Sequence, residues 1–388
     1  MKIIYLLAYI MIMSVCTFSL SGCNRSGTAD VEVAPEDNVP INSNPTKIPD
    51  SGLHGKQDWD SSNIELDSDI HDAEIITIGF VQVGHESAWR EAATESVLDT
   101  FSRDNGYELM FIDSDNNSDY QKQAAMQFIE QKIDYLIIDP IVTGGWDNVL
   151  KAAKEAGVKV FVIDRTIDCD ESMYEAWFGS DFEAEGEAAG AWLEAYLKDK
   201  GREKEDISIV TVAGTKGSAA RKGRTKGFSK YIKKNDNWTK LAEKDGEFTK
   251  ESGKRIMEEF IIKYGKIDVV VCHNDNEAWG AMEALDEAGI TYGMGGDTIL
   301  ISFDAVYESL EYVLSGKINA DFECNPLSAP YIEDAIRRIE SGRHVVSKTN
   351  YIDEACFQAE NNVYTIEYAG RTSKMITVTE QVLKSRAY

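Results

Sequence analysis

The chain has 388 residues, of which 43% are hydrophobic, so it is long enough for two domains and apolar enough to bury their cores. Its formal net charge is −27, from 67 acidic and 40 basic residues. This charge argues against nucleic-acid binding, which needs a basic surface, and against docking on an anionic bilayer through basic patches.

The first 23 residues have the pattern of an export signal. Lys2 precedes an almost unbroken apolar run, and the sequence becomes polar after Leu20-Ser-Gly-Cys23. Small residues before a cysteine resemble a bacterial lipobox, whose cysteine is acylated and becomes the mature N-terminus. The alternative is a signal anchor with an incidental cysteine, but the short apolar run favours processing. We therefore expect a lipoprotein signal peptide over 1–23, and a protein anchored by lipid at Cys23 on the extracytoplasmic face of the cell membrane.

Residues 24–73 show no hydrophobic periodicity. They hold four of the seven prolines, together with many Asp, Ser, Asn and Gly residues. This composition predicts a disordered tether that spans about 40 Å as a flexible coil.

From residue 74 onward, apolar runs rich in β-branched residues alternate with amphipathic helical patterns. The predicted strands are 75–83, 107–112, 134–138, 158–163, 206–212, 267–272, 297–302 and 318–323. The predicted helices are 87–104, 118–131, 146–156, 182–198, 218–233, 249–264, 276–288, 306–315 and 327–341. This alternation predicts an α/β fold with parallel sheets covered by helices on both faces. Two lobes are favoured over one very large sheet, with the clearest break near Gly179-Ser-Asp181.

The first strand leads into a helix for which Ser87 is the expected N-cap. Glu86, Trp89 and Arg90 follow at i, i+3 and i+4, so they share one face if all three lie in the first turn. That face would present a carboxylate, an aromatic ring and a guanidinium to a ligand. The alternative is an ordinary first turn with Trp89 in the core.

Polar or aromatic residues follow the other predicted strands as well. In open α/β sheets, ligands bind at the carboxyl ends of the strands, so these residues are expected to surround one crevice between the lobes. The candidates are Gln82, Glu86, Trp89, Arg90, Asp139, Asp164, Arg165, Arg224, Phe248, His273, Asn274, Asp304, Glu323, Cys324 and Asn325.

The chemistry of this set favours a neutral polyol such as a sugar. Hydroxyl groups both donate and accept hydrogen bonds, which suits Asp, Asn and Arg side chains. Trp89 and Phe248 would offer aromatic platforms for the apolar face of a sugar ring. The strongest candidates balance three guanidiniums against three carboxylates, whereas an anionic ligand would require net positive charge. Asp164 and Arg165 could also simply pair with each other.

No catalytic, cofactor or metal motif stands out. Residues 113–117 begin like an EF-hand loop, but the glycine and glutamate that the loop requires are missing. Residues 118–121 have the pattern of a capping box. Neither a P-loop, nor a nucleophile elbow, nor a C-x-x-C pair occurs. The cysteines after the export signal are expected to be small buried hydrophobes, with a disulfide left open: Cys169, Cys272, Cys324 and Cys356.

From about residue 75 to 350, the chain resembles the periplasmic sugar-binding proteins of ABC transporters, of the ribose- and galactose-binding type. Within that family it looks most like the galactofuranose binders. The motifs that carry the resemblance are Val81-Gln-Val-Gly-His-Glu-Ser-Ala-Trp-Arg90, Thr143-Gly-Gly-Trp146, Val162-Ile-Asp-Arg-Thr-Ile-Asp168, Asp245-Gly-Glu-Phe-Thr249, His273-Asn-Asp275 and Ser302-Phe-Asp304. The sugar contacts that the resemblance implies are Glu86, Ser87, Trp89, Arg90, Asp164, Arg165, Arg224, Phe248, Asn274 and Asp304. Ribose binders have a glutamine where this chain has Cys324, which suggests that Glu323 or Asn325 takes its place.

The resemblance also implies a type I periplasmic-binding-protein fold, in which two doubly wound lobes are joined by a three-stranded hinge and close around the sugar. The implied N-terminal lobe is 74–181 plus 325–350, and the implied C-terminal lobe is 182–324 plus 351–388. The expected partners are a monosaccharide, an ABC permease and its ATPase. The protein is expected to be a monomer without cofactor or metal.

Three other functions compete with sugar import. A receptor of the same fold could pass its sugar signal to a membrane sensor kinase or chemoreceptor, and the receptor sequence alone does not distinguish this from transport. A glycosidase could use Glu86 and Asp304, but nearby arginines lower the pKa of a carboxyl that must act as an acid. A sugar-responsive repressor would need an N-terminal DNA-binding segment where this chain has an export signal.

Overall fold

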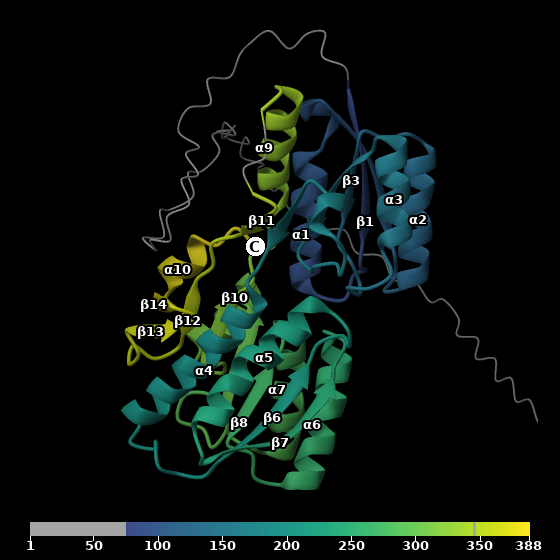
Figure 1. Ribbon diagram of the computed structural model, residues 1–388. Helices are drawn as coiled ribbons and strands as arrows, with labels where there is room; N and C mark the ends of the chain where they lie inside the picture. The colour runs from purple at the N-terminus through teal and green to yellow at the C-terminus, as the bar shows by residue number, and fades with distance from the viewer. Residues whose placement is uncertain (1–74, 344–346) are drawn as a thin grey trace, which may run out of the picture. The chain divides into compact units, whose positions relative to one another are not determined.

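The computed structural model describes residues 75–343 and 347–388 (Figure 1). The predicted signal peptide, with Cys23, and the predicted tether lie outside these residues. In the part of the chain that is described, no helix is both long and apolar enough to cross a bilayer.

The first sheet is entirely parallel, in the order β11-β5-β4-β3-β1-β2. Its strands are β1 (Ile76–Gln82), β2 (Tyr107–Asp113), β3 (Tyr135–Ile138), β4 (Lys159–Ile163), β5 (Ala176–Gly179) and β11 (Thr349–Tyr351).

Successive side chains of a β-strand point to opposite faces of its sheet, so neighbouring residues of these strands enter different cores. Ile78 and Phe80 pack in the core under α1 (Ala88–Thr100) and α9 (Ala329–Glu340). Val81 packs in the other core, under α2 (Ser118–Glu130) and α3 (Asp147–Ala156), which lie side by side (Figure 1). Two short 3₁₀ helices, η1 (Arg103–Asn105) and η2 (Glu171–Met173), complete this half.

The second sheet has the order β13-β14-β12-β10-β9-β8-β6-β7. Its strands are β6 (Ile207–Ala213), β7 (Trp238–Asp245), β8 (Val269–Cys272), β9 (Ile299–Asp304), β10 (Ala320–Glu323), β12 (Cys356–Gln358), β13 (Thr365–Tyr368) and β14 (Arg371–Thr377). The run from β7 to β10 is parallel, while β12 is antiparallel to β10 and β13 is antiparallel to β14.

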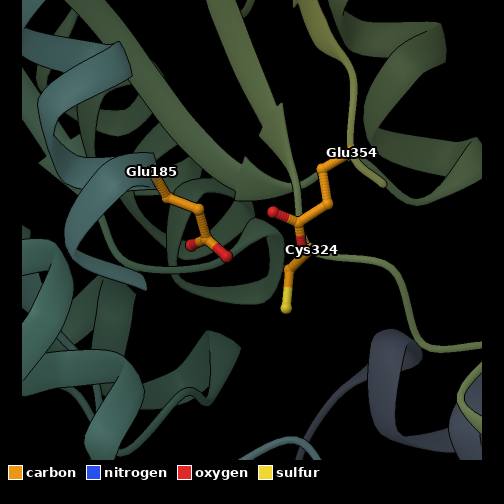
Figure 2. A group of neighbouring side chains, drawn as sticks. All are labelled: Glu185, Cys324 and Glu354. Atoms are coloured by element: carbon orange, nitrogen blue, oxygen red, sulfur yellow. The ribbon is translucent and has the colours of Figure 1, made fainter. Parts of the chain in front are cut away.

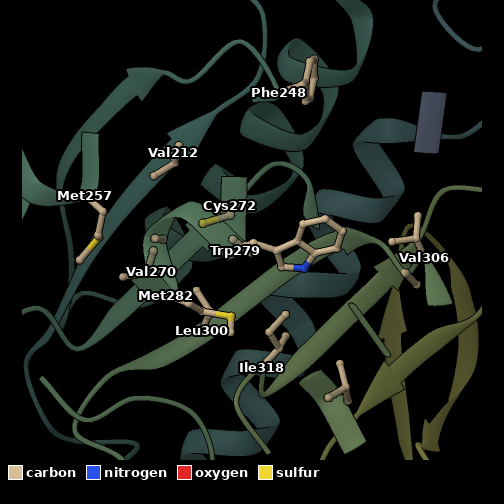
Figure 3. Close-up of a cluster of buried hydrophobic side chains, with 14 of the residues drawn as sticks. Val212, Phe248, Met257, Val270, Cys272, Trp279, Met282, Leu300, Val306 and Ile318 are labelled. Atoms are coloured by element: carbon tan, nitrogen blue, oxygen red, sulfur yellow. The ribbon is translucent and has the colours of Figure 1, made fainter. Parts of the chain in front are cut away.

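Helices cover both faces of this sheet too. On one face, the core includes Trp192 from α4 (Phe182–Asp199) and Phe228 from α5 (Ala219–Lys234). On the other face, the core draws on α6 (Lys250–Tyr264), α7 (Asp275–Ala288) and α8 (Tyr307–Leu314), and Figure 3 shows part of this cluster. The chain crosses between the sheets after β5, after β10 and after β11, and a short helix, α10 (Glu380–Lys384), follows β14.

The predicted α/β architecture with parallel sheets and helices on both faces is confirmed. Sequence patterns missed β5, β7 and the strands after residue 348, because these segments are short or carry exposed polar residues. For example, β7 is an edge strand in which only Trp238 is buried. The capping box was wrong, since Asn117 caps α2 by accepting from the amides of Asp119 and Tyr120. The disulfide left open is not formed, because the four cysteines of the described region are all free.

Candidate ligand-binding site

A small cavity lies at the carboxyl ends of the strands and draws its lining from both halves of the fold. It contains about 270 Å³ of space not filled by atoms, part of it open to solvent. Polar and aromatic side chains share the lining of this small space. The lining residues are Glu86, Ser87, Trp89, Arg90, Asp164, Arg165, Phe182, Ala220, Arg224, Phe248, Asn274, Asp304 and Cys324.

Arg90 is the centre of the first half of the site. The hydroxyl of Ser87 caps α1 by accepting from the amide of Arg90, as predicted. The Arg90 guanidinium donates to Glu86 at 2.9 Å, to Asp164 at 2.9 Å and to Asp139. Glu86 precedes the N-cap, so it reaches Arg90 from outside the helix rather than from its first turn as the sequence suggested. Three carboxylates therefore hold one guanidinium in a single orientation.

Asp139 lies behind this guanidinium and is not part of the cavity lining. It is fully buried, and burial raises the pKa of its carboxyl well above the usual range, although Arg90 opposes the shift. Burial alone would also raise the pKa of Glu86, but Arg90 and Arg165 outweigh it and lower that pKa. Glu86 thus presents a charged carboxylate at the cavity, and Asp139 supports Arg90 from outside the lining.

Arg165 links the arginine cluster to the aromatic wall. It donates to the carbonyl of Ile141 at 3.2 Å and to Glu86 at 3.4 Å, and its guanidinium lies 5.2 Å from the centroid of the Phe248 ring. The expected pairing with Asp164 is present at 3.6 Å. Two buried polar atoms here form no hydrogen bond, Oε2 of Glu86 and Nε of Arg165, although the Arg165 Nε is the atom that lies 3.6 Å from Asp164. An acceptor and a donor without hydrogen-bond partners suit a ligand hydroxyl, which both donates and accepts.

Arg224 is the corresponding guanidinium of the second half. It donates to Glu185 at 2.6 Å, to Asp304 at 3.2 Å and to the carbonyl of His273. Close helix packing fixes its place on α5, because a Cβ at Gly186 of α4 would lie 2.3 Å from the Arg224 carbonyl oxygen. Burial raises the pKa of Asp304 well above its usual range despite Arg224.

Phe248 is held over the cavity by its backbone. Its φ of 63° lies in the left-handed region, which is strained for a bulky residue. The Glu277 carboxylate accepts from the Phe248 amide at 3.0 Å, and Asn274 donates to the Phe248 carbonyl at 3.1 Å. Asn274 also caps α7, so its side chain is used to position this loop.

Trp89 forms an aromatic wall on the side of α1. Its ring is 6% exposed and belongs to the same buried cluster as Phe182 and Phe248. The Trp89 indole N–H donates to the carbonyl oxygen of Cys324, just after β10. The sequence posed a choice between core and site, and the structure places Trp89 in both.

Most of the residues that the sequence placed around the crevice line this cavity; the exceptions are Gln82, Asp139, His273, Glu323 and Asn325. The Glu323 carboxylate accepts from Arg386, Tyr388 and the amide of Ala355, which explains why it does not reach the cavity. Cys324 itself, rather than Glu323 or Asn325, lines this edge.

Sequence reasoning missed Phe182, Ala220 and the supporting Glu185. Phe182 and Glu185 lie in the first turn of α4, directly after the Gly179-Ser-Asp181 break. The sequence signal that could have indicated Phe182 and Glu185 was the predicted start of a helix directly after the predicted break between the lobes.

Comparison with known proteins agrees with this geometry. Residues 78–326 match the family model of the periplasmic binding protein domain. The chain is similar to the galactofuranose-binding protein YtfQ of Escherichia coli (strain K12), with 35% identity over 267 residues, 68% of this chain and 81% of the relative.

Two solved structures are also similar. One, from Mycobacterium smegmatis in complex with β-D-fucofuranose, is 35% identical, with a TM-score of 0.69 over 73% of this chain and 91% of that one. The other is the periplasmic binding protein component of the arabinose ABC transporter from Shewanella sp. ANA-3, bound to α- and β-L-arabinofuranose. It is 33% identical, with a TM-score of 0.69 over 74% of this chain and 93% of that one. Two of these three proteins are named as binding proteins, in agreement with the expectation that the chain is not an enzyme. The chain belongs to the periplasmic binding protein family.

Proposed function

We propose that this protein is the substrate-binding component of a sugar ABC importer and that it binds a monosaccharide in its furanose form, such as galactofuranose. The observation that carries the proposal is the cavity between the two halves, where paired arginines and carboxylates face aromatic rings. Three similar proteins support a furanose ligand, because one is named a galactofuranose-binding protein and the other two were solved with fucofuranose and arabinofuranose.

The charge of the lining favours a neutral ligand. Most donors of Arg90 and Arg224 are already bonded to carboxylates or carbonyls, so little positive charge is left for an anion. The unpartnered atoms of Glu86 and Arg165 suit a hydroxyl, and Trp89, Phe182 and Phe248 suit the apolar face of a sugar ring. A charged ligand would require a lining with a surplus of the opposite charge.

The proposed mechanism is closure of two lobes about the three crossings, with 74–181 plus 325–350 as one lobe and 182–324 plus 351–388 as the other. Contacts between the two halves would form on closure, for example the donation from the Ala88 amide to Asn276 at 3.2 Å. Part of the binding energy of the sugar is used to close the hinge, so the measured affinity is lower than the contacts alone would give. The closed form would present the surface that the permease recognises.

Titration calorimetry of the protein without its first 23 residues tests the ligand class. The panel contains galactofuranose, arabinofuranose, ribose, galactose and glucose. We expect tight binding of at least one furanose, with no turnover of the sugar. Binding of pyranoses alone would refute the furanose assignment. Hydrolysis of a glycoside would refute the proposal that the protein is a binding protein.

The proposed site of action is the extracytoplasmic face of the membrane, with a lipid on Cys23 as anchor and the folded part as a monomer. Fractionation of cells that express the protein or Cys23→Ser tests the anchor. We expect the protein in the membrane fraction and the variant outside it. An unchanged membrane fraction for Cys23→Ser would contradict lipidation at this residue.

A further inference from the structure

Three potential metal ligands meet where the chain crosses between the two sheets. Glu185 lies in the first turn of α4, Cys324 directly follows β10, and Glu354 precedes β12. A carboxylate oxygen of each glutamate and the Cys324 thiol all lie within 4.8 Å of one another. Figure 2 shows the three side chains turned toward a common space. No local sequence pattern predicts this cluster, because its members are far apart along the chain.

One atom of the cluster has no partner. Oε1 of Glu185 is buried and forms no hydrogen bond, while Oε2 accepts from Arg224 at 2.6 Å. Glu185 is only 5% exposed. A buried carboxylate oxygen without a donor is costly, so its presence calls for a bound group. Because Oε1 belongs to a carboxylate that turns toward a thiol and a second carboxylate, a cation would satisfy it.

Charge balance points the same way. Arg224 is the cation bonded to this cluster, and it also binds Asp304. If Cys324 is a thiolate and both glutamates are ionised, the three ligands carry three negative charges. A divalent cation would offset two of them, and Arg224, which is shared with Asp304, would offset part of the rest.

The donor set also selects the type of metal. A thiolate with two carboxylates suits Zn²⁺ and related borderline metals, whereas Ca²⁺ and Mg²⁺ prefer all-oxygen sites. The Ser180 hydroxyl, from the first crossing, lies 3.2 Å from the Cys324 sulfur and donates to Glu354, which fixes the positions of both ligands. We propose that Glu185, Cys324 and Glu354 form a binding site for a divalent transition metal of the Zn²⁺ type, with the Cys324 proton released to solvent on binding.

Such a metal would join α4 to the second and third crossings of the chain. Cys324 also lines the cavity, so an occupied site would change the affinity of the proposed sugar. This consequence rests on the proposed function, whereas metal binding itself does not. The two can therefore fail separately.

The test uses Co²⁺ as a spectroscopic probe and Zn²⁺ in calorimetry, with protein that carries Cys23→Ser to exclude the N-terminal thiol. We expect one Co²⁺ per chain and a near-ultraviolet thiolate-to-cobalt charge-transfer band. Cys324→Ser should remove the band, and Glu354→Gln should weaken Zn²⁺ binding by about tenfold or more. The matched control is Cys356→Ser, since Cys356 is also a buried free cysteine but lies outside the cluster.

A missing charge-transfer band would overturn the site, as would a band that persists in Cys324→Ser. If Cys324→Ser fails to fold, as judged by circular dichroism, Glu354→Gln decides the question, because unchanged Zn²⁺ affinity in that variant would also overturn the proposal.

Discussion

The indole N–H of Trp89 donates to the carbonyl oxygen of Cys324, which joins the first turn of α1 to the second crossing of the chain. One residue of the cavity wall is thus bonded to the backbone at a crossing between the two halves. Under the proposed closure, this bond would link ligand binding at the cavity to the geometry of the crossing.

Two substitutions at Trp89 separate the hydrogen bond from the aromatic wall. Trp89→Phe keeps a ring but leaves a buried carbonyl unpaired, so we expect about fivefold to tenfold weaker sugar binding. Trp89→Ala removes the wall as well, and we expect a loss of about a hundredfold. Calorimetry measures both affinities, and circular dichroism checks the fold. Equal affinities for the two variants would mean that the ring does not contact the sugar.

Arg90→Lys should destabilise the fold as well as the site. A lysine has a single ammonium group and cannot replace the fork that binds Glu86, Asp139 and Asp164 together. Because Asp139 would be left buried without its partner, we expect a loss of about 3–5 kcal/mol in the free energy of unfolding. Urea denaturation measures the loss. The control is Lys151→Ala, which removes an exposed pair with Glu155 and should change stability by less than about 0.5 kcal/mol.

Gly214→Ala tests the position of Phe248 without changing any polar group. A Cβ at residue 214 would lie 1.9 Å from the Phe248 ring, so the ring must leave its place on the cavity wall. We expect sugar binding to weaken by about tenfold or more, with a loss of about 1–3 kcal/mol in stability. Gly144→Ala is the control, since a Cβ there would meet no atom within 4 Å. Unchanged affinity in Gly214→Ala would remove Phe248 from the binding wall.

The sequence predicted the fold and most of the cavity lining because both follow from local rules. Buried parallel strands read as apolar runs, and the residues after them gather at one edge of a sheet. This is why Arg90, Asp164 and Asp304 could be named from the sequence alone. The family resemblance added Ser87 as a ligand contact, whereas the alternation of strands and helices indicated it only as a helix N-cap.

The errors arose where tertiary pairing decided the outcome. Glu323 follows β10 as expected, but Arg386 and Tyr388 return from the end of the chain to occupy its carboxylate. Glu185 was missed because nothing in its neighbourhood predicts that α4 packs closely against Arg224. Such contacts join distant segments, and a single sequence carries no local signal for them.

The carboxyl pair Asp275 and Asp321 predicts a pH dependence of stability. Ser309 has one hydroxyl hydrogen but lies 2.8 Å from an oxygen of each carboxyl, so one carboxyl must be protonated to bond with it. Burial raises the pKa of Asp321 to about 7 and that of Asp275 well above its usual range.

The folded protein therefore holds a proton that the unfolded chain releases near pH 4. This contribution to stability is complete below that pH and falls as the pH rises toward 7, by an amount on the order of 3 kcal/mol. Asp321→Asn removes the neighbouring carboxyl that helps burial to raise the pKa of Asp275, so the fall between pH 5 and pH 8 in urea denaturation should be smaller than in the unchanged protein. An identical fall in both would show that this pair is not the source.

Asn276→Ala tests whether closure contributes to affinity. The Asn276 side chain accepts from the amide of Ala88, the first residue of α1, and it is not part of the cavity lining. The first amides of a helix have no partner inside the helix and bond to water when they are exposed. When the two halves meet, Asn276 of α7 replaces that water as the acceptor for the first amide of α1. Removing that acceptor should favour the open form without changing any sugar contact.

We expect about threefold to tenfold weaker apparent binding of the sugar by Asn276→Ala, mainly through faster dissociation in stopped-flow measurements. The control is Lys222→Ala, which removes an exposed contact with Thr143 at 3.0 Å and should have little effect because solvent competes for both groups. If the affinity of Asn276→Ala is unchanged, the two halves do not need this contact to hold the sugar. If dissociation is faster while urea denaturation is unchanged, the contact acts on closure rather than on folding, as expected for a bond between two halves that separate.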